Sequence, residues 1–158
     1  MGEAFQPSVE QIEEVETSAQ IAACFEVFQA LRPHLTSAEE LVRRIQQQQQ
    51  AGYRVAGIRD DSDSRARYVS VIGYRPMDCL AWGKTIYIDD LSTLPEARGR
   101  GHGGRLLDYV RQQAEATGCD VVHLDSGYTR SDAHRLYLNK GYVLLCHHLL
   151  LDLHSDRA

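Results

Sequence analysis

A glycine- and arginine-rich segment of this chain has the composition of an anion-binding loop. It lies between a strand-like run at 86–94 and a helix-like run at 106–117, and it reads Arg98-Gly99-Arg100-Gly101-His102-Gly103-Gly104. Glycines let the backbone turn tightly near a phosphate, and the N–H groups that open the next helix have no intrahelical acceptor and point at the anion. Arg98, Arg100 and Arg105 add positive charge. These residues predict a site for a phosphate-containing ligand.

Two familiar phosphate loops can be compared with this segment. The P-loop needs a Gly-Lys-Ser/Thr end, which is absent here. The dinucleotide fingerprint G-x-G-x-x-G is met by Gly99, Gly101 and Gly104, but past the middle of a short chain no room remains for two βαβαβ halves. A dinucleotide module would also need an acidic residue about twenty residues later, where Asp120 or Asp125 would serve. This alternative stays open.

Two motifs of the chain match a known family. The first is Arg98-x-x-Gly101-x-Gly103, preceded by Asp89-Asp90-Leu91-Ser92-Thr93-Leu94-Pro95, and the second is Ala133-His134-Arg135-Leu136-Tyr137-Leu138-Asn139-Lys140-Gly141-Tyr142. They resemble two motifs of the GNAT superfamily of N-acetyltransferases. The first resembles that family's Arg/Gln-x-x-Gly-x-Gly/Ala loop together with the fourth strand that precedes it. The second resembles its Ala-x-x-Phe/Leu-Tyr helix. The resemblance covers residues 53–152 and implies acetyl-coenzyme A as co-substrate.

The resemblance also implies how acetyl-coenzyme A is held. The loop amides would bind the pyrophosphate, and the main chain at Leu91 and Thr93 would bind the acetyl group and pantetheine arm like an added strand. Arg130 stands where the family often has Asn, so it either contacts the coenzyme phosphates or is a solvated helix-start residue. The expected cofactor-binding residues are Leu91, Ser92, Thr93, Arg98, Gly99, Arg100, Gly101, His102, Gly103, Gly104 and Arg130.

Amide formation needs a deprotonated amine and a protonated leaving group. Removing the proton of an ammonium with a pKa near 10 costs about 4 kcal/mol at pH 7. The resemblance assigns the base role to Asp89, with Asp90 as an ammonium-holding or structural partner, although each could instead be a turn or cap ligand. As strand neighbours, the two are predicted to face opposite sides. Tyr137 matches the family tyrosine that protonates the departing thiolate, and the alternative is a core-packing ring.

The predicted function is transfer of the acetyl group to a primary amine of a small molecule by direct attack in a ternary complex. The acidic residues Asp78, Asp89 and Asp90 favour a cationic acceptor. The alternatives are a non-catalytic acyl-coenzyme A sensor and a protein or peptide N-acetyltransferase. No metal is expected, because His147 and His148 are strand neighbours that face opposite sides and the other histidines are scattered.

The composition indicates one domain over residues 1–158. With 17 basic and 22 acidic residues the net charge is −5, so no general nucleic-acid partner is expected. The four cysteines form no CxxC pair and lie in or beside apolar runs, which suits reduced, mostly buried thiols. No signal peptide or membrane span is recognisable, so a cytoplasmic protein is predicted. The apolar stretch 143–153 is compatible with a homodimer.

The expected fold is α/β, a GNAT fold with a mixed central sheet of six to seven strands flanked by about four helices. Strands are predicted at 9–16, 53–59, 67–75, 85–94 and 119–125, the last in mid-sheet, with one or two more within 142–153. A polar hairpin turn is expected at 60–64 and a second connection at 76–84. Apolar periodicity, a capping box at 37–40 and terminal glycines predict helices at 19–31, 37–50, 103–117 and 131–139.

Overall fold

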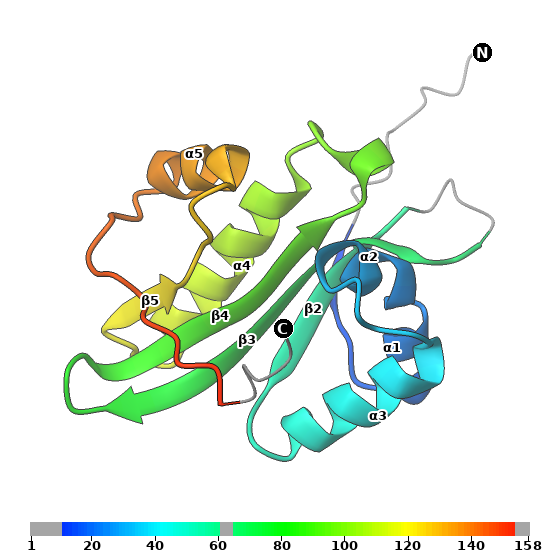
Figure 1. Cartoon of the computed structure of the whole chain (residues 1–158), viewed down its shortest axis with the longest axis horizontal. Helices are drawn as coiled ribbons and strands as arrows, with labels where there is room; N and C mark the ends of the chain where they lie inside the picture. The colour runs from blue at the N-terminus through cyan, green and yellow to red at the C-terminus, as the bar shows by residue number, and fades with distance from the viewer. Residues whose placement is uncertain (1–10, 61–64, 154–158) are drawn as a thin grey trace, which may run out of the picture. The chain divides into compact units, whose positions relative to one another are not determined.

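The computed structural model describes residues 11–60 and 65–153. The chain forms two compact parts, residues 1–124 and 125–158, and each is described by itself. Figure 1 labels the α-helices of both parts and the strands β2 to β5. The expected strand start at 9–10, most of the predicted turn at 60–64, and His154 lie outside the described residues.

A five-stranded mixed sheet forms the framework of the first part. Its order is β1-β2-β3-β4-β5, with the first four strands antiparallel and β5 parallel to β4. The strands are β1 (Ile12–Glu14), β2 (Arg54–Arg59), β3 (Tyr68–Cys79), β4 (Gly83–Thr93) and β5 (Val121–Leu124). The mixed α/β class is confirmed, although the described residues contain five strands rather than six or seven.

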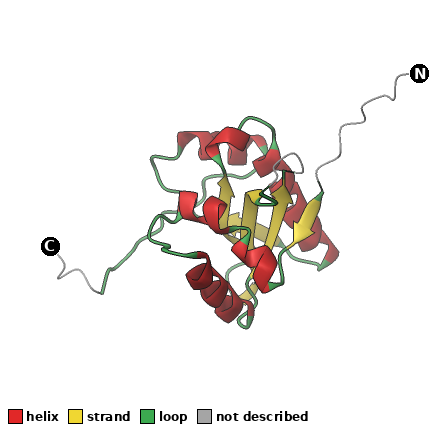
Figure 2. Ribbon diagram, turned by 90° about the vertical axis from the view of Figure 1, so that its right-hand side faces the viewer, coloured by secondary structure: helices red, strands yellow, loops and turns green. Residues whose placement is uncertain are grey.

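Helices cover both faces of this sheet (Figures 1 and 2). One face packs against α1 (Ser18–Ala22), α2 (Phe25–Leu31) and α3 (Ala38–Gln49), through a core that includes Val69 and Val71 of β3. The other face packs against α4 (His102–Ala116), where Tyr74 of β3 meets Tyr109 edge-on with ring centroids 6.5 Å apart. Alternate side chains of β3 therefore pack against the helices on opposite faces of the sheet. A short 3-10 helix, Pro95–Ala97, links β4 to the loop before α4.

The single helix predicted at 19–31 is wrong, because the chain breaks between α1 and α2. The carbonyl of Ala23 accepts a hydrogen bond from the backbone N–H of Tyr68 at 3.1 Å, and the N–H of Cys24 donates to Ile21 only three residues back. Apolar periodicity continues through the break since both short helices bury the same face. A tertiary contact with β3 thus overrides the local helical pattern.

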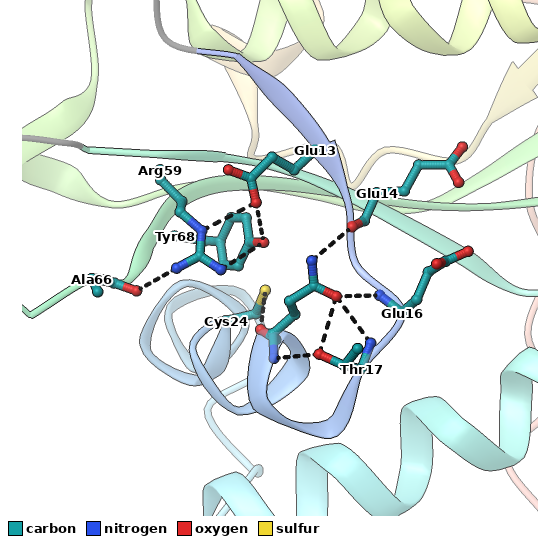
Figure 3. A network of polar contacts seen from close by, with 9 residues as sticks. Glu13, Glu14, Glu16, Thr17, Cys24, Arg59, Ala66 and Tyr68 are labelled. Carbon is teal, nitrogen blue, oxygen red and sulfur yellow. Dashed lines mark hydrogen bonds and ion pairs between the residues drawn. The ribbon is translucent and has the colours of Figure 1, made fainter.

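The polar network in Figure 3 joins β1 to β2, β3 and α1. Glu13 accepts hydrogen bonds from Arg59 and Tyr68, at 3.1 and 2.9 Å, and the Arg59 guanidinium lies 4.4 Å from the centre of the Tyr68 ring. Burial, followed by the bond to Glu13, raises the pKa of Tyr68 to about 12. The Gln20 side chain donates to the Glu14 carbonyl and completes a capping box with Thr17, so one side chain ties β1 to the start of α1.

The predicted start of α3 is confirmed, with one difference in its capping. Ser37 accepts from the N–H of Glu40, but the Glu40 carboxylate accepts from the N–H and the hydroxyl of Thr36, one residue further back than a capping box requires. These bonds, the backbone one first, lower the pKa of Glu40 to about 2. The glutamines up to Gln49 form the helix end, as predicted.

The predicted connection at 76–84 is mostly strand, because β3 continues to Cys79 and β4 begins at Gly83. Pro76 lies inside β3 opposite Ile86 of β4. Proline is tolerated there because β2 pairs with β3 only as far as Tyr74, so no neighbouring strand on that side requires an N–H from Pro76.

The end of the chain departs most from the prediction. Residues 142–153 form no strand, and β5 is an edge strand of the described sheet rather than a central one. An apolar run has the composition of a strand but needs a partner for its backbone groups, and in the described residues it pairs with none. The expectation of mostly buried thiols is also wrong, since of the four cysteines only Cys24 is buried and Cys146 is exposed.

Candidate active site

The predicted anion loop has the backbone geometry that its glycines indicated. Gly99 and Gly101 have φ of +76° and +82°, in the left-handed region that strains other residues. A Cβ at either position would meet nothing within 4 Å, so the conformation rather than space requires glycine. The first hydrogen bond of α4 runs from Arg105 N to Gly101 O, which leaves the N–H groups of Gly103 and Gly104 without an intrahelical acceptor. The loop therefore fits an anionic ligand.

The arginines of the loop connect it to its surroundings. Arg98 Nε donates to the carbonyl of Thr93 at 3.2 Å, which joins the loop to the end of β4. Arg100 Nη1 lies 3.3 Å from the Asp60 carboxylate while the residue stays exposed. His102, by contrast, is buried at the first position of α4. Of these predicted residues, Arg98 and Arg100 present positive charge at the surface.

β4 has one unpaired side next to this loop. Among the described residues, β5 pairs with β4 only from Thr85 to Ile88, so residues 89–93 have β3 as their single neighbouring strand. Leu94 N donates to Val69 O of β3 at 2.8 Å. Because backbone direction alternates along a strand, Ser92 also bonds toward β3, and the backbone groups of Leu91 and Thr93 point to the unpaired side. This is the edge expected for the pantetheine arm.

The two acidic residues of β4 lie on the same face of the sheet, so the prediction of opposite faces is wrong. The register with β3 passes from Ile88 opposite Tyr74 to Asp90 opposite Gly73, which leaves Asp89 as the extra residue of a β-bulge. A bulge resets the alternation of side chains. The acids consequently meet the same group of partners, on the face that packs against α1, α2 and α3.

Each carboxylate is held by an arginine. Arg75 of β3 donates to both oxygens of Asp89 at 2.9 Å, and it also donates to Gln48 of α3 at 3.0 Å. Arg32, which ends α2, donates to Asp90 Oδ1 at 2.9 Å and to the backbone carbonyl of Asp89 at 3.0 Å. The first arginine pair is bidentate, a geometry that strengthens charge-assisted hydrogen bonds. We call Arg32, Arg75, Asp89 and Asp90 the ion cluster.

Tyr53 also contacts the ion cluster. Its hydroxyl donates to Asp90 Oδ2 at 2.7 Å, and Arg75 lies 5.4 Å from the centre of its ring. Burial, then the charge of Asp90, raises the pKa of Tyr53 well above its ordinary value, so it acts as a hydrogen-bond donor. The ring reaches Asp90 by crossing Gly73, where an added Cβ would lie 1.9 Å from the hydroxyl oxygen.

Arg32, Tyr53 and Arg75 were not found from the sequence. Their contacts join residues up to 58 positions apart, and no local pattern links them. The one available signal was Gly73, because a lone glycine inside a strand pattern indicates a bulge or a close approach. The structure has both at this point.

The remaining predicted residues lie in the second part of the chain. Tyr137 is half-buried on α5 (Ser131–Asn139), edge-on to Tyr142 with ring centroids 5.8 Å apart. Burial raises the pKa of its hydroxyl, which suits a proton donor, and the nearby charge of Arg130 opposes this shift. Arg130 is the exposed residue before α5 and makes no side-chain capping bond.

The match to a known protein family spans both motifs of the chain. The profile of the Acetyltransferase (GNAT) family matches residues 20–142, which is most of the chain. This chain belongs to the GNAT acetyltransferase family. It is 31% identical over 119 residues to an uncharacterized N-acetyltransferase of Bacillus subtilis, YhdJ, covering 75% of this chain and 81% of that protein. The chain is therefore an acetyl-coenzyme A-dependent N-acetyltransferase.

Other similarities are shorter or concern the fold alone. An aminoalkylphosphonate N-acetyltransferase of Salmonella typhimurium is 38% identical over 55 residues, covering 35% of this chain and 36% of that protein. An acetyltransferase of Trypanosoma brucei has a TM-score of 0.75 at 21% identity, covering 90% of this chain and all of its own. Glucosamine-6-phosphate N-acetyltransferase of Arabidopsis thaliana has a TM-score of 0.75 at 17% identity, covering 92% and 99%.

No group of three or more His, Cys, Asp or Glu side chains in the described residues could hold a metal ion. Within the same ranges, no helix is both long and apolar enough to cross a membrane.

Proposed function

We propose that this GNAT protein transfers the acetyl group of acetyl-coenzyme A to the primary amine of a small molecule, by direct attack in a ternary complex. The observation that carries the proposal is the junction of two features at the end of β4. Its unpaired backbone at 89–93 is joined through the Arg98–Thr93 bond to a left-handed glycine loop that opens a helix. The unpaired backbone suits the extended, amide-bearing pantetheine arm, and the glycine loop suits the pyrophosphate.

Acetyl-coenzyme A supplies the activated acetyl thioester, and the residues of the chain hold it and move protons. Leu91 and Thr93 would bind the arm through backbone groups. The loop amides around Gly103 and Gly104 would bind the pyrophosphate, with Arg98 and Arg100 as charges and Arg130 as a further phosphate contact. Tyr137 would protonate the departing thiolate.

Asp89 is the proposed proton acceptor and Asp90 its structural partner. Both oxygens of each carboxylate accept hydrogen bonds, from Arg32 and Tyr53 at Asp90 and from Arg75 at Asp89. The two differ in exposure, and the Asp90 side chain is only 13% exposed. The Asp89 carboxylate is 22% exposed beside Arg75, so it has lone pairs available to an amine proton or to a water that relays it. Its pairing with Arg75 also gives it a second role, as the counter-ion of that arginine.

The test is a rate assay that follows thiol release and amide formation with a panel of small amines, including an aminoalkylphosphonate because one relative acts on that class. Tyr137→Phe and Asp89→Asn are compared with wild type, with acetyl-coenzyme A binding measured by calorimetry. We expect each variant to keep its coenzyme affinity and to lose about 10²-fold or more in kcat. Tight coenzyme binding without turnover on any amine would support an acyl-coenzyme A sensor instead, and acetylation of peptides alone would change the acceptor class.

A further inference from the structure

The ion cluster points to the chemical class of the acceptor. It holds two arginines and two aspartates in one connected group, so its net charge is zero. An acidic pair alone would attract a simple cation, which is what the sequence suggested. The two guanidinium groups cancel that field at short range.

The arginines are the more accessible members of the cluster. The Arg32 side chain is 43% exposed while its partner Asp90 is 13% exposed, and Arg75 is 28% exposed while Asp89 is 22% exposed. An approaching molecule therefore meets positive charge at least as readily as negative charge.

Both arginines also keep hydrogen-bonding capacity. Arg32 donates through Nε and Nη2, and Arg75 uses the same two nitrogens. Neither Nη1 group donates to an acceptor within the part of the chain that the structure describes. A guanidinium has five N–H donors in a planar fork that matches carboxylate and phosphonate oxygens. The contacts to Asp89 and Asp90 fix the orientation of each fork without using all of it.

The position of the cluster connects it to the reaction. Asp89 and Asp90 directly precede Leu91 to Thr93, the backbone proposed to hold the acetyl-bearing arm. Both arginines contact Asp89, one at its carboxylate and the other at its carbonyl, so their guanidinium groups lie within about 10 Å of each other. That span suits a small acceptor whose amine and acid group are a few bonds apart.

We propose that the acceptor is a zwitterion, a primary amine carrying a phosphonate, phosphate or carboxylate group a few bonds away, and that Arg32 and Arg75 bind its anionic group. This inference rests on the proposed acetyl transfer and adds the specificity-determining residues to it. The ammonium group meets the Asp89 side of the cluster, while the anion meets the unused Nη1 groups. Binding therefore adds a cationic group and an anionic group to a cluster that already holds both signs of charge.

The experiment uses four acceptors that share the unit H₂N–CH₂–CH₂–X and differ in the end group. They are 2-aminoethylphosphonate, β-alanine, propylamine and 1,3-diaminopropane, which end in a dianion, a monoanion, a methyl group and a cation. Each is assayed at saturating acetyl-coenzyme A for kcat/KM. We expect the two anionic acceptors to exceed propylamine by on the order of 10- to 100-fold, the scale of a charge-assisted hydrogen bond, and the diamine to be poorest.

Variants then test the assignment to residues. Arg32→Gln and Arg75→Gln should each reduce the ratio of phosphonate to propylamine kcat/KM by about tenfold or more, and Arg32→Lys should restore part of it. Arg43→Gln is the matched control, because Arg43 is an exposed arginine of α3 outside the cluster. A best rate with the diamine, or an equal loss on all four acceptors in the arginine variants, would overturn the inference.

A binding measurement separates this inference from the proposed function. Calorimetric titration of 2-aminoethylphosphonate and propylamine into the protein with coenzyme A bound reports the anion site without requiring turnover. Binding of the phosphonate that Arg32→Gln weakens, with no acetylation of any amine, supports the anion site and refutes the transferase function. Acetylation of propylamine without preference for an anion supports the function and refutes the site. Absence of both refutes both.

Discussion

Replacing Gly73 with alanine should disconnect Tyr53 from Asp90. The added Cβ would lie 1.9 Å from the Tyr53 hydroxyl oxygen, 2.5 Å from Cζ and 2.9 Å from Cε2, so the ring must move away from the strand. The 2.7 Å bond to Asp90 and the stacking of Arg75 on the ring would be lost with it. Overpacking and the loss of a hydrogen bond to a charged group together predict a cost of about 2–4 kcal/mol.

Urea unfolding of wild type, Gly73→Ala, Tyr53→Phe and the double variant measures this cost. We expect the double variant to lose less stability than the two single variants added together, because the hydrogen bond can be lost only once. Gly57→Ala is the control, since its Cβ would meet the Tyr68 ring at 2.6 Å, away from the ion cluster. It should reduce stability and leave kcat unchanged, whereas Gly73→Ala should reduce both. Wild-type stability in Gly73→Ala, or strict additivity, would refute the reasoning.

Two more predictions concern the loop and the start of α3. Gly101→Ala should weaken acetyl-coenzyme A binding by on the order of 5- to 30-fold in calorimetry, because a left-handed alanine costs about 1–2 kcal/mol, and unchanged affinity would contradict the role of the +82° φ. Glu40 has a folded pKa of about 2 against an ordinary 4.5, so its stabilising contribution is complete above pH 4.5 and is lost as pH falls toward 2. The melting temperature of wild type should therefore exceed that of Glu40→Gln near neutral pH and converge with it in acid, and a constant difference would exclude the Thr36 contact as its cause.

The sequence predicted best those features that depend on neighbouring residues. The loop at 98–104, the helix that follows it and the helix at 131–139 were all anticipated, because glycine conformations, helix starts and apolar periodicity are local properties. The family motifs extended this to the co-substrate, since they mark the same local segments.

Features that depend on distant partners were missed. The break at Ala23 is caused by Tyr68, and the common face of Asp89 and Asp90 is caused by the register of β4 against β3. The run at 142–153 has strand composition without a strand partner in the described residues. In each case the deciding interaction lies outside the window in which a sequence pattern can be recognised, and the arginines of the ion cluster were missed for the same reason.

The unpaired side of β4 also affects how the protein behaves in solution. A strand edge with free N–H and C=O groups is a template on which another extended chain can add, and natural proteins protect such edges to avoid aggregation. In the proposed function the co-substrate pairs with residues 89–93 and would cover this edge, where the carbonyls of Asp89 and Thr93 already accept hydrogen bonds from Arg32 and Arg98. The proposed site thus predicts that purifying and storing the protein with coenzyme A present reduces its aggregation.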